Sequence, residues 1–191
     1  AQRTSRIRMG PLVYLLPLYN PLRLIQEVCM LDHLSHGRLE LGVGRGIVPY
    51  EVARFGVDPE EGRAMFDDAL AVLLKGLQNE TLNHEGEFYN YKDIKFWIKP
   101  YQKPHPPIWY ASGNLETVPW MAKNAIHTSH IFDTNEITKK HFDLYHELWE
   151  KHKGDPDRIN NGAAEPKQGQ TRHVYIAPTD AEAVAEARVA W

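Results

Sequence analysis

The sequence RLELGVGRG, residues 38–46, ends an apolar run with three glycines that are spaced two apart. The alternation of apolar and polar residues at its start is typical of a β-strand. Gly42, Gly44 and Gly46 follow, and Arg45 lies between the last two. Glycine permits a positive φ in a turn, and in a strand it often marks the close approach of another backbone or of a ligand. We therefore expect a strand end that packs closely against a neighbour or holds an anionic ligand beside Arg45.

The composition is that of a soluble globular protein, with 191 residues of which 42% are hydrophobic and 25% charged. The net charge is −3 and no basic run is present, so nucleic acid is not an expected partner. No apolar stretch approaches the roughly 18 residues of a membrane span, and no signal peptide is recognisable. Cys29 is the only cysteine, which excludes an internal disulfide and favours a reducing cytoplasm.

Strands and helices are expected to alternate in one domain over residues 1–191. The chain begins without methionine and stops within a helical pattern, which indicates a domain incomplete at both ends. The predicted strands cover residues 6–16, 38–44, 107–111, 127–132 and 171–177. The predicted helices cover residues 21–36, 58–78, 114–125, 135–153 and 178–190. Residues 80–100 interrupt this alternation, and Glu85-Gly86 between aromatic-rich runs predicts a β-hairpin insertion.

Alternating strands and helices favour a parallel sheet with right-handed crossovers. Two architectures fit this order: a doubly wound sheet, or part of an eight-stranded βα barrel. Both place ligand sites at the carboxyl ends of their strands. The glycines of residues 42–46 fall at such an end, so both architectures predict a site there.

Two glycine-containing segments are candidates for binding an anion. The first, residues 42–46, has the spacing G-x-G-x-G and lacks the G-x-G-x-x-G of a dinucleotide-binding fold. The second is Ser112-Gly113-Asn114, which leads from a strand into a helix and would suit a phosphate group. A simple helix cap by Asn114 also explains the second segment, and the local sequence favours it. Both interpretations stay open on the sequence.

Histidines do not form a recognisable metal site. His33 and His36 lie near a predicted helix end, and His127 and His130 flank a predicted strand. Neither pair has a carboxylate or cysteine at the spacing of zinc ligands. We interpret them as surface or capping histidines and expect no metal.

Several longer motifs, taken together, resemble the bacterial luciferase-like flavin-dependent monooxygenase family. The motifs LDHLSHGR, LGVGRG, FGVDPEEGRAMFDDAL, HEGEFY and HPPIWYASGN follow one another in the order and spacing of that family. The resemblance covers residues 6–188. It implies a TIM (β/α)8 barrel that holds reduced FMN, or a deazaflavin, at the carboxyl ends of its strands. On this pattern the chain supplies about strands three to seven of the barrel, with the β-hairpin as an insertion.

The resemblance also implies which residues bind the cofactor. Arg45 matches an arginine that contacts the flavin phosphate, and the loop with Gly113 and Asn114 closes around the same phosphate. Leu12 and Val13 match a non-prolyl cis peptide beneath the isoalloxazine ring. The full implied set is Leu12, Val13, Gly44, Arg45, Gly46, Ile47, Gly113, Asn114, Thr117 and Phe132.

The chain departs from luciferase itself at three places. Gly44 replaces a cysteine that precedes the arginine, and Gly113 replaces a glutamate. The histidine that luciferase carries on an early strand would lie before residue 1. The catalytic residues are therefore not assigned from this sequence.

The resemblance implies a monooxygenase that acts on paired donors and incorporates oxygen. It would take reduced FMN from a separate flavin reductase and use molecular oxygen to oxidise a small organic substrate. A homodimer or heterodimer is the expected assembly. Three alternatives remain open: a deazaflavin-dependent dehydrogenase on the same scaffold, a flavin-binding protein without catalysis, and an inactive fragment.

Overall fold

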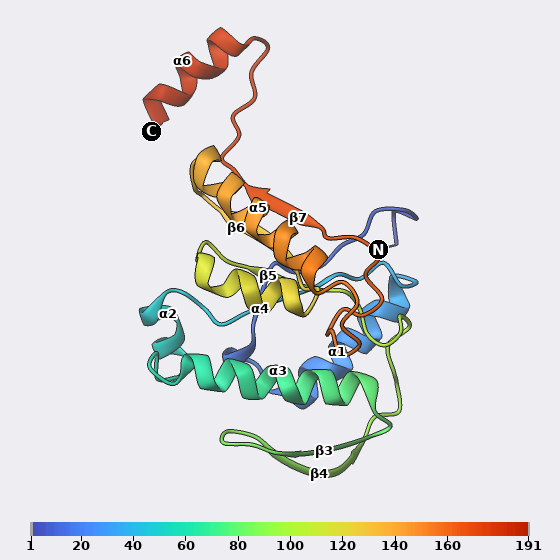
Figure 1. The fold of residues 1–191 in the computed structure, drawn as a ribbon. Coiled ribbons are helices and arrows are strands. Elements are labelled where there is room, and N and C mark those ends of the chain that lie inside the picture. Colours follow the sequence, from blue (N-terminus) through green and yellow to red (C-terminus); the bar gives the residue numbers. More distant parts are fainter. Residues whose placement is uncertain (1, 191) are drawn as a thin grey trace.

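A computed structural model describes residues 2–190 and contains one main sheet of five strands. These are β1 (Tyr14–Leu15), β2 (Leu41–Gly44), β5 (Ile108–Ala111), β6 (His127–Ile131) and β7 (Gln168–Thr171). Every neighbouring pair is parallel, and the order across the sheet is β1-β2-β5-β6-β7 (Figure 1). Each strand of this sheet is short, with two to five residues.

The strand order separates the two architectures that the sequence left open. A doubly wound sheet reverses its strand order at a switch point, where its ligand binds. Here the order follows the chain from one edge to the other without reversal. This is the arrangement of an arc of a (β/α) barrel. The barrel is not closed within residues 2–190, since β1 and β7 each have one neighbouring strand there.

Helices pack against one face of this sheet. They are α1 (Pro21–Leu34), α3 (Gly62–Gln78), α4 (Val118–Lys123) and α5 (Asn135–Lys151). Figure 1 shows α4 and α5 in front of the labelled strands of this sheet, and α3 below them. The Asn20 side chain caps α1 by accepting a hydrogen bond from the Arg23 N–H, and Gly37, with φ +74°, follows its end. Both features agree with the expected start and stop of this helix.

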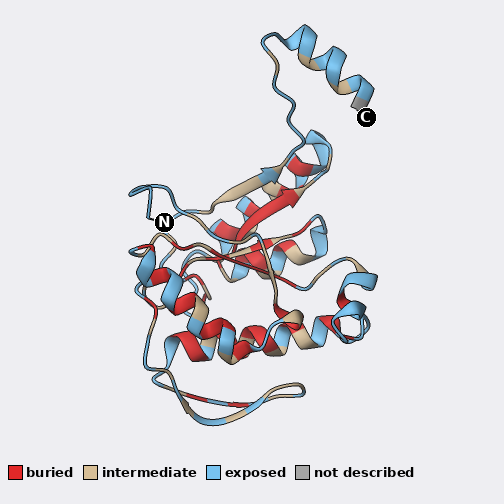
Figure 2. Cartoon of the chain, turned by 180° about the vertical axis from the view of Figure 1, so that it is seen from behind, coloured by how far each residue is buried: buried red, intermediate tan, exposed pale blue. Residues whose placement is uncertain are grey.

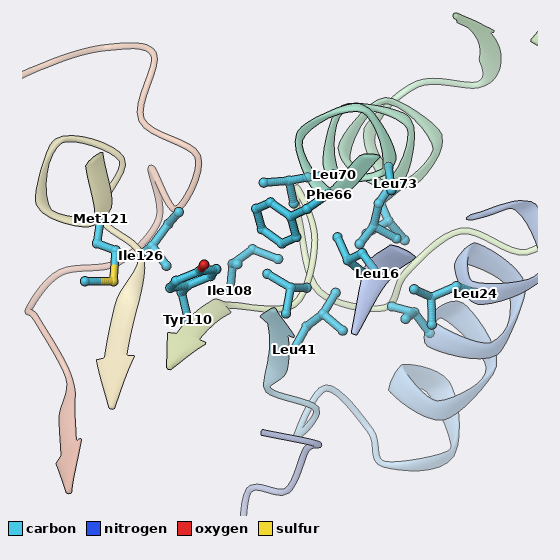
Figure 3. Close-up of a cluster of buried hydrophobic side chains, with 14 of the residues drawn as sticks. Leu16, Leu24, Leu41, Phe66, Leu70, Leu73, Ile108, Tyr110, Met121 and Ile126 are labelled. Atoms are coloured by element: carbon cyan, nitrogen blue, oxygen red, sulfur yellow. The ribbon is translucent and has the colours of Figure 1, made fainter. Parts of the chain in front are cut away.

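The core lies between α3 and the strands. Leu41, Ile108 and Tyr110 from β2 and β5 meet Phe66 and Leu70 from α3 (Figure 3). All five are buried. Burial of each such side chain stabilises the fold by about 1.5–3 kcal/mol. This packing fixes the ends of the strands relative to α3, so side chains at those ends share one rigid frame.

The β-hairpin expected over residues 80–100 is present. It consists of the antiparallel strands β3 (Thr81–Glu85) and β4 (Asn90–Lys95), which form a separate two-stranded sheet. The hairpin lies beneath α3 in Figure 1. Asp68 of α3 holds it by accepting hydrogen bonds from the N–H groups of Phe88 and Tyr89, at 2.8 and 3.0 Å.

The strand expected over residues 171–177 is displaced. β7 covers Gln168–Thr171, and the apolar side chains that suggested the later strand are exposed, Val174 at 76% and Ile176 at 86%. The expected strand over residues 6–16 is also shorter. It contains β1 and one isolated bridge between Met9 and Leu39, with irregular backbone at Gly10 and Pro11 between them.

Two predictions near residue 58 need correction, one of a helix start and one of a stretch without regular structure. The helix expected from residue 58 begins at Gly62, because the Asp58 carboxylate accepts a hydrogen bond from the Glu60 N–H, at 2.9 Å, within a turn. The stretch before it, expected as a loop, contains the short helix α2 (Pro49–Arg54). The short 3-10 helices η1 (Leu16–Leu18) and η2 (Leu115–Thr117) follow β1 and β5.

The last helix, α6 (Asp180–Ala190), stands apart from the rest of the molecule. Figure 1 shows it beyond β7 at the end of an extended segment, and Figure 2 colours nearly all of it as exposed. Thr179 caps this helix by accepting a hydrogen bond from the Glu182 N–H, at 3.3 Å. Among residues 2–190 no helix has both the length and the apolar character needed to cross a membrane.

Candidate functional site

A cleft of about 810 Å³ lies at the carboxyl ends of the main strands. The strand ends that line it are Leu15 of β1, Gly44 of β2, Ala111 of β5, Ile131 of β6 and Thr171 of β7. Its volume falls in the range of small-molecule and cofactor sites, about 300–1,000 Å³. Every site residue named from the sequence lines it: Leu12, Val13, Gly44, Arg45, Gly46, Ile47, Gly113, Asn114, Thr117 and Phe132.

The three glycines after residue 41 are explained by close packing at two positions and by backbone conformation at the third. A Cβ on Gly42 would collide with the carbonyl oxygen of Pro11, and one on Gly44 would lie 2.5 Å from Val13 Cγ2. Gly46 has a φ of +90°, which favours glycine whatever lies nearby. The close-packing interpretation is therefore correct at Gly42 and Gly44, where the segment before β1 occupies the space that a ligand was expected to fill.

The segment that approaches these glycines contains the Leu12–Val13 peptide bond, which is cis. The resemblance implies a cis bond at this position. Leu12 is 52% exposed, and both residues line the cleft. They form an apolar wall next to the end of β2.

Two arginines give one end of the cleft positive charge. Arg45 follows β2, is exposed, and has no hydrogen bond or ion pair within the part of the chain that the structure describes. Arg63 lies in the first turn of α3 and pairs with Asp67, with 2.8 Å between Nε and Oδ2. Burial raises the pKa of the Tyr110 phenol, and both guanidinium groups oppose this effect. Tyr110 therefore lies within electrostatic reach of both cations.

Sequence reasoning missed Arg63 and Tyr110 as cleft residues. The helix predicted over residues 58–78 contains Arg63, but the prediction starts it at Asp58 and so does not place Arg63 at its amino end. A helix that follows a parallel strand starts at the carboxyl end of the sheet, so its first residues face the site. Tyr110 belongs to β5, and its inward or outward direction depends on a register that the sequence does not give.

The loop after β5 is held by its own side chains. Ser112 Oγ accepts hydrogen bonds from the Asn114 N–H, at 3.0 Å, and from the Thr117 hydroxyl, at 2.7 Å. Asn114 Oδ1 accepts from the Glu116 N–H, at 2.9 Å, so Asn114 caps η2 as one interpretation proposed. The Gly113 N–H has no acceptor among residues 2–190. It remains available for a ligand in the cleft.

Two of the histidines interpreted as surface or capping residues are in fact buried. His127 and His130 of β6 are 2% and 0% exposed, respectively. His33 remains at the surface, where its ring contacts the Lys99 carbonyl oxygen at 2.9 Å. The correction follows from the burial of β6 on both faces, where His127 and His130 find partners on neighbouring segments.

The cleft thus has a polar end and an apolar end. Arg45, Arg63 and the Gly113 N–H offer positive charge and donors, and Glu116 adds one carboxylate. The apolar surface comes from Leu12, Val13, Ile47, Ile131 and Phe132. Phe132 has a φ of +47° and stacks on the His173 ring, with 4.7 Å between centroids. Such a cleft suits a ligand that carries an anionic group at one end of a flat apolar body.

An arc of a (β/α) barrel with a cleft at its strand ends defines the class of α/β barrel proteins. Comparison with known proteins narrows this class. A family model described as luciferase-like monooxygenase matches residues 1–191. The chain belongs to the luciferase-like monooxygenase family.

Individual relatives support this assignment. An uncharacterized protein of Sinorhizobium fredii is 43% identical over 124 residues, which cover 65% of this chain and 36% of the relative. The alkanal monooxygenase alpha chain of Aliivibrio fischeri is 28% identical over 161 residues, which cover 83% of this chain and 45% of the relative. The chain thus spans less than half the length of each of these two relatives.

Solved structures share the fold. Monooxygenase RslO1 from Streptomyces bottropensis has a TM-score of 0.84 at 25% identity, over 99% of this chain and 56% of its own. The oxygenating constituent of 3,6-diketocamphane monooxygenase from Pseudomonas putida, in complex with FMN, has a TM-score of 0.80 at 22% identity, over 99% and 54%. An F420-dependent secondary alcohol dehydrogenase has a TM-score of 0.76 at 17% identity, over 98% and 56%.

Proposed function

We propose that this chain forms the cofactor-binding part of a flavin-dependent monooxygenase. Reduced FMN would occupy the cleft, with its phosphate at the polar end and its ring against the apolar end. The observation that carries the proposal is Arg45, an unpartnered guanidinium within residues 2–190 that lies at the rim of a cleft at the strand ends. A guanidinium is suited to a phosphate because its N–H groups match the phosphate oxygens in pairs.

The residues present fit this cofactor. Arg45 and Arg63 would balance the charge of a phosphate, and the Gly113 N–H would donate to one of its oxygens. Leu12 and Val13 would lie against the flavin ring and exclude water from that side. The chemistry that bound FMN supplies is the reduction of molecular oxygen and the oxidation of a small organic substrate. The chain's own side chains would bind and orient the cofactor and shape the space for that substrate.

The proposal includes partners. A relative from Acinetobacter baylyi, the oxygenase component of a flavin-dependent trigonelline monooxygenase, is 26% identical over 189 residues. An oxygenase component by its name works with another component, so we propose that a separate flavin reductase supplies the reduced cofactor here and that the reaction incorporates oxygen with paired donors. A homodimer or heterodimer and a cytoplasmic location remain predictions.

A deazaflavin-dependent dehydrogenase is the second candidate. It is favoured by the likeness to the F420-dependent alcohol dehydrogenase, which is described in complex with an F420–acetone adduct. The same polar and apolar ends would suit a deazaflavin with a phosphate on its side chain. Such an enzyme would transfer a hydride and would not consume oxygen during turnover.

Titration of the protein with FMN and with a deazaflavin, followed by fluorescence, tests the choice of cofactor. We expect saturable binding of FMN. The Arg45→Ala variant should bind FMN at least about tenfold more weakly, because a hydrogen bond to a charged group contributes roughly 1.5–3 kcal/mol. Arg54→Ala is the matched control, since Arg54 lies on α2 over the Tyr50 ring and outside the cleft lining.

Each outcome of this titration has a defined meaning. An unchanged FMN affinity in Arg45→Ala would remove Arg45 from the phosphate site. Preference for the deazaflavin, without oxygen uptake during turnover, would replace the monooxygenase with the dehydrogenase. Tight FMN binding with neither oxygen-dependent nor hydride-transfer turnover would indicate a flavin-binding protein without catalysis.

A further inference from the structure

His130 lies against the loop that follows β5, behind the residues that line the cleft. It belongs to β6 and its side chain is fully buried. Its ring nitrogens have two partners on different segments. Nδ1 is 3.2 Å from the carbonyl oxygen of Ser112, and Nε2 is 3.1 Å from Oδ2 of Asp133. The ring thus joins the loops that follow β5 and β6, both of which line the cleft.

Both partners of the His130 ring are hydrogen-bond acceptors. A neutral imidazole has one N–H group and would direct a lone pair at the second oxygen. An imidazolium donates from both nitrogens and satisfies both contacts. The Asp133 side chain is 33% exposed, so its carboxylate also meets water. The ring is thus held between two oxygens, one on the loop after β5 and one on the loop after β6.

Titratable and charged groups approach His130 from α5 and from the segment after β7. On the α5 side the His141 ring lies 4.6 Å away between centroids, and burial, followed by the charge on His130, lowers the pKa of His141 to about 4. After β7, the Arg172 guanidinium contacts the Asp133 carbonyl oxygen. On β5 the partner is the Ser112 carbonyl, which does not titrate. His141 is thus neutral at physiological pH.

His130 is connected to the cleft through the loop it supports. Its ring holds the Ser112 carbonyl, while the Ser112 hydroxyl holds the Asn114 N–H and the Thr117 hydroxyl. A Cβ on Gly113 would lie 4.0 Å from His130 Cε1 and 3.9 Å from Asp133 Oδ2. The histidine therefore lies next to Gly113, which lines the cleft and whose N–H has no acceptor among residues 2–190.

We propose that His130 is a positioning residue for phosphate binding. By donating from Nδ1 to the Ser112 carbonyl it fixes the Ser112–Asn114 loop, and with it the position of the Gly113 N–H that would meet the anion. This inference rests on the proposed function, since the anion is the FMN phosphate. It adds a role for a residue outside the set that the family resemblance implied.

The test compares FMN with riboflavin, which has the same ring system but no phosphate, on the intact protein. In His130→Gln we expect FMN affinity to fall about tenfold or more and riboflavin affinity to stay within about twofold. His141→Gln is the matched control. It makes the same change at an equally buried ring on α5, which lies next to His130. In this variant the ratio of FMN to riboflavin affinity should not change.

Two further measurements keep the inference testable if His130→Gln does not fold. Asp133→Asn removes the carboxylate that pairs with the ring, and it should lower the ratio of FMN to riboflavin affinity in the same direction. In the wild-type protein, ¹⁵N NMR of the ring should show a proton on Nδ1 of His130, the nitrogen that faces the Ser112 carbonyl. A bare Nδ1 would remove this hydrogen bond and overturn the inference.

The outcomes separate this inference from the proposed function. A wild-type protein that does not bind FMN would overturn both. FMN binding with equal FMN-to-riboflavin ratios in the wild type, His130→Gln and Asp133→Asn would overturn the inference alone. A variant that loses riboflavin and FMN affinity equally would show that His130 only supports the fold.

Discussion

Gly44 and Gly113 both line the cleft, but a side chain would meet different surroundings at the two positions. At Gly44 a Cβ would lie 2.5 Å from Val13 Cγ2 and 3.4 Å from Val13 Cβ. Valine is stiff at χ1, so its methyl group cannot turn away without moving the backbone. At Gly113 the nearest atoms, on Asp133 and His130, would be 3.9 and 4.0 Å away. One glycine is required by packing and the other is not.

We predict that Gly44→Ala lowers the free energy of unfolding by about 1–3 kcal/mol, the usual cost of overpacking. Gly113→Ala should change it by less than about 0.5 kcal/mol, as is usual where there is room. Urea unfolding of the two variants beside the wild type measures both effects. Equal losses of stability would show that the segment before β1 yields to a side chain at Gly44.

At the residue scale the sequence predicted which residues line the cleft, but not which contacts require them. The pattern around Gly44 and Arg45 indicates a strand end that packs closely or binds a ligand. The atoms that require Gly42 and Gly44, on Pro11 and Val13, lie about thirty residues earlier in the chain, so no local pattern reports them. His130 looked like a surface histidine because its partners, on the loops after β5 and β6, meet only in the folded sheet.

At the scale of elements, apolar composition misled at β7. Val174 and Ile176 predicted a strand over residues 171–177, yet both are exposed. The true strand, Gln168–Thr171, is polar because its side chains have polar partners: the Gln168 amide donates to the Phe142 carbonyl, and Gln170 contacts the Thr138 hydroxyl at 2.7 Å. Sequence patterns detect strands that pack against apolar neighbours and miss a partly exposed strand that hydrogen bonds hold in place.

The β-hairpin was predicted correctly, and its attachment to α3 has a pH dependence that can be worked out. Burial alone would raise the pKa of Asp68, but hydrogen bonds from His84, Phe88 and Tyr89 outweigh it, so the pKa lies below its usual value. The Asp68 carboxylate is 10% exposed and lies 2.5 Å from His84 Nε2. A depressed pKa in the folded state means that the stability it contributes is present above the unfolded-state pKa, about 3.9, and is lost as the pH falls through the folded-state pKa.

We predict that Asp68→Asn destabilises the protein by about 2 kcal/mol at pH 7, in the range for hydrogen bonds to a charged group. The difference from wild type should shrink at about pH 3, where the wild-type carboxyl itself becomes protonated. Urea unfolding at the two pH values measures this. Asp67→Asn is the control on the same helix, since that side chain is 51% exposed and its ion pair should contribute less than about 1 kcal/mol. A pH-independent effect at Asp68 would argue against the assigned cause.

At the scale of the whole molecule, the alternation of strands and helices predicted a parallel sheet, and the strand order completed the assignment as a barrel arc. Sequence alone left the doubly wound sheet open, because it gives the succession of elements and not which strands become neighbours. The arc keeps an open edge at β1 and at β7 within residues 2–190. These edges present unpaired backbone groups that other strands can meet.

We predict that in a polypeptide of these 191 residues the amides of α6 exchange with solvent at least about 100-fold faster than those of α5. An isolated helix shorter than about 12–15 residues is marginal in water, and α6 has 11 residues, nearly all exposed. By contrast α5 buries Tyr145 and Trp149 against the sheet side of the molecule. Hydrogen exchange resolved by mass spectrometry measures the difference. Equal protection would mean that α6 finds a partner surface in solution.

The uninterrupted strand order also bears on how the polypeptide is made. In the main sheet each strand pairs with the strand of that sheet that came before it in the chain, from β1 through β7. A nascent chain leaving the ribosome can therefore add each strand to an edge that already exists, with its helix covering the new surface. Most of the ordering entropy is then lost in short steps between consecutive units. In a complete barrel only the pairing of the first strand with the last closes the sheet, so this step must wait until synthesis has finished.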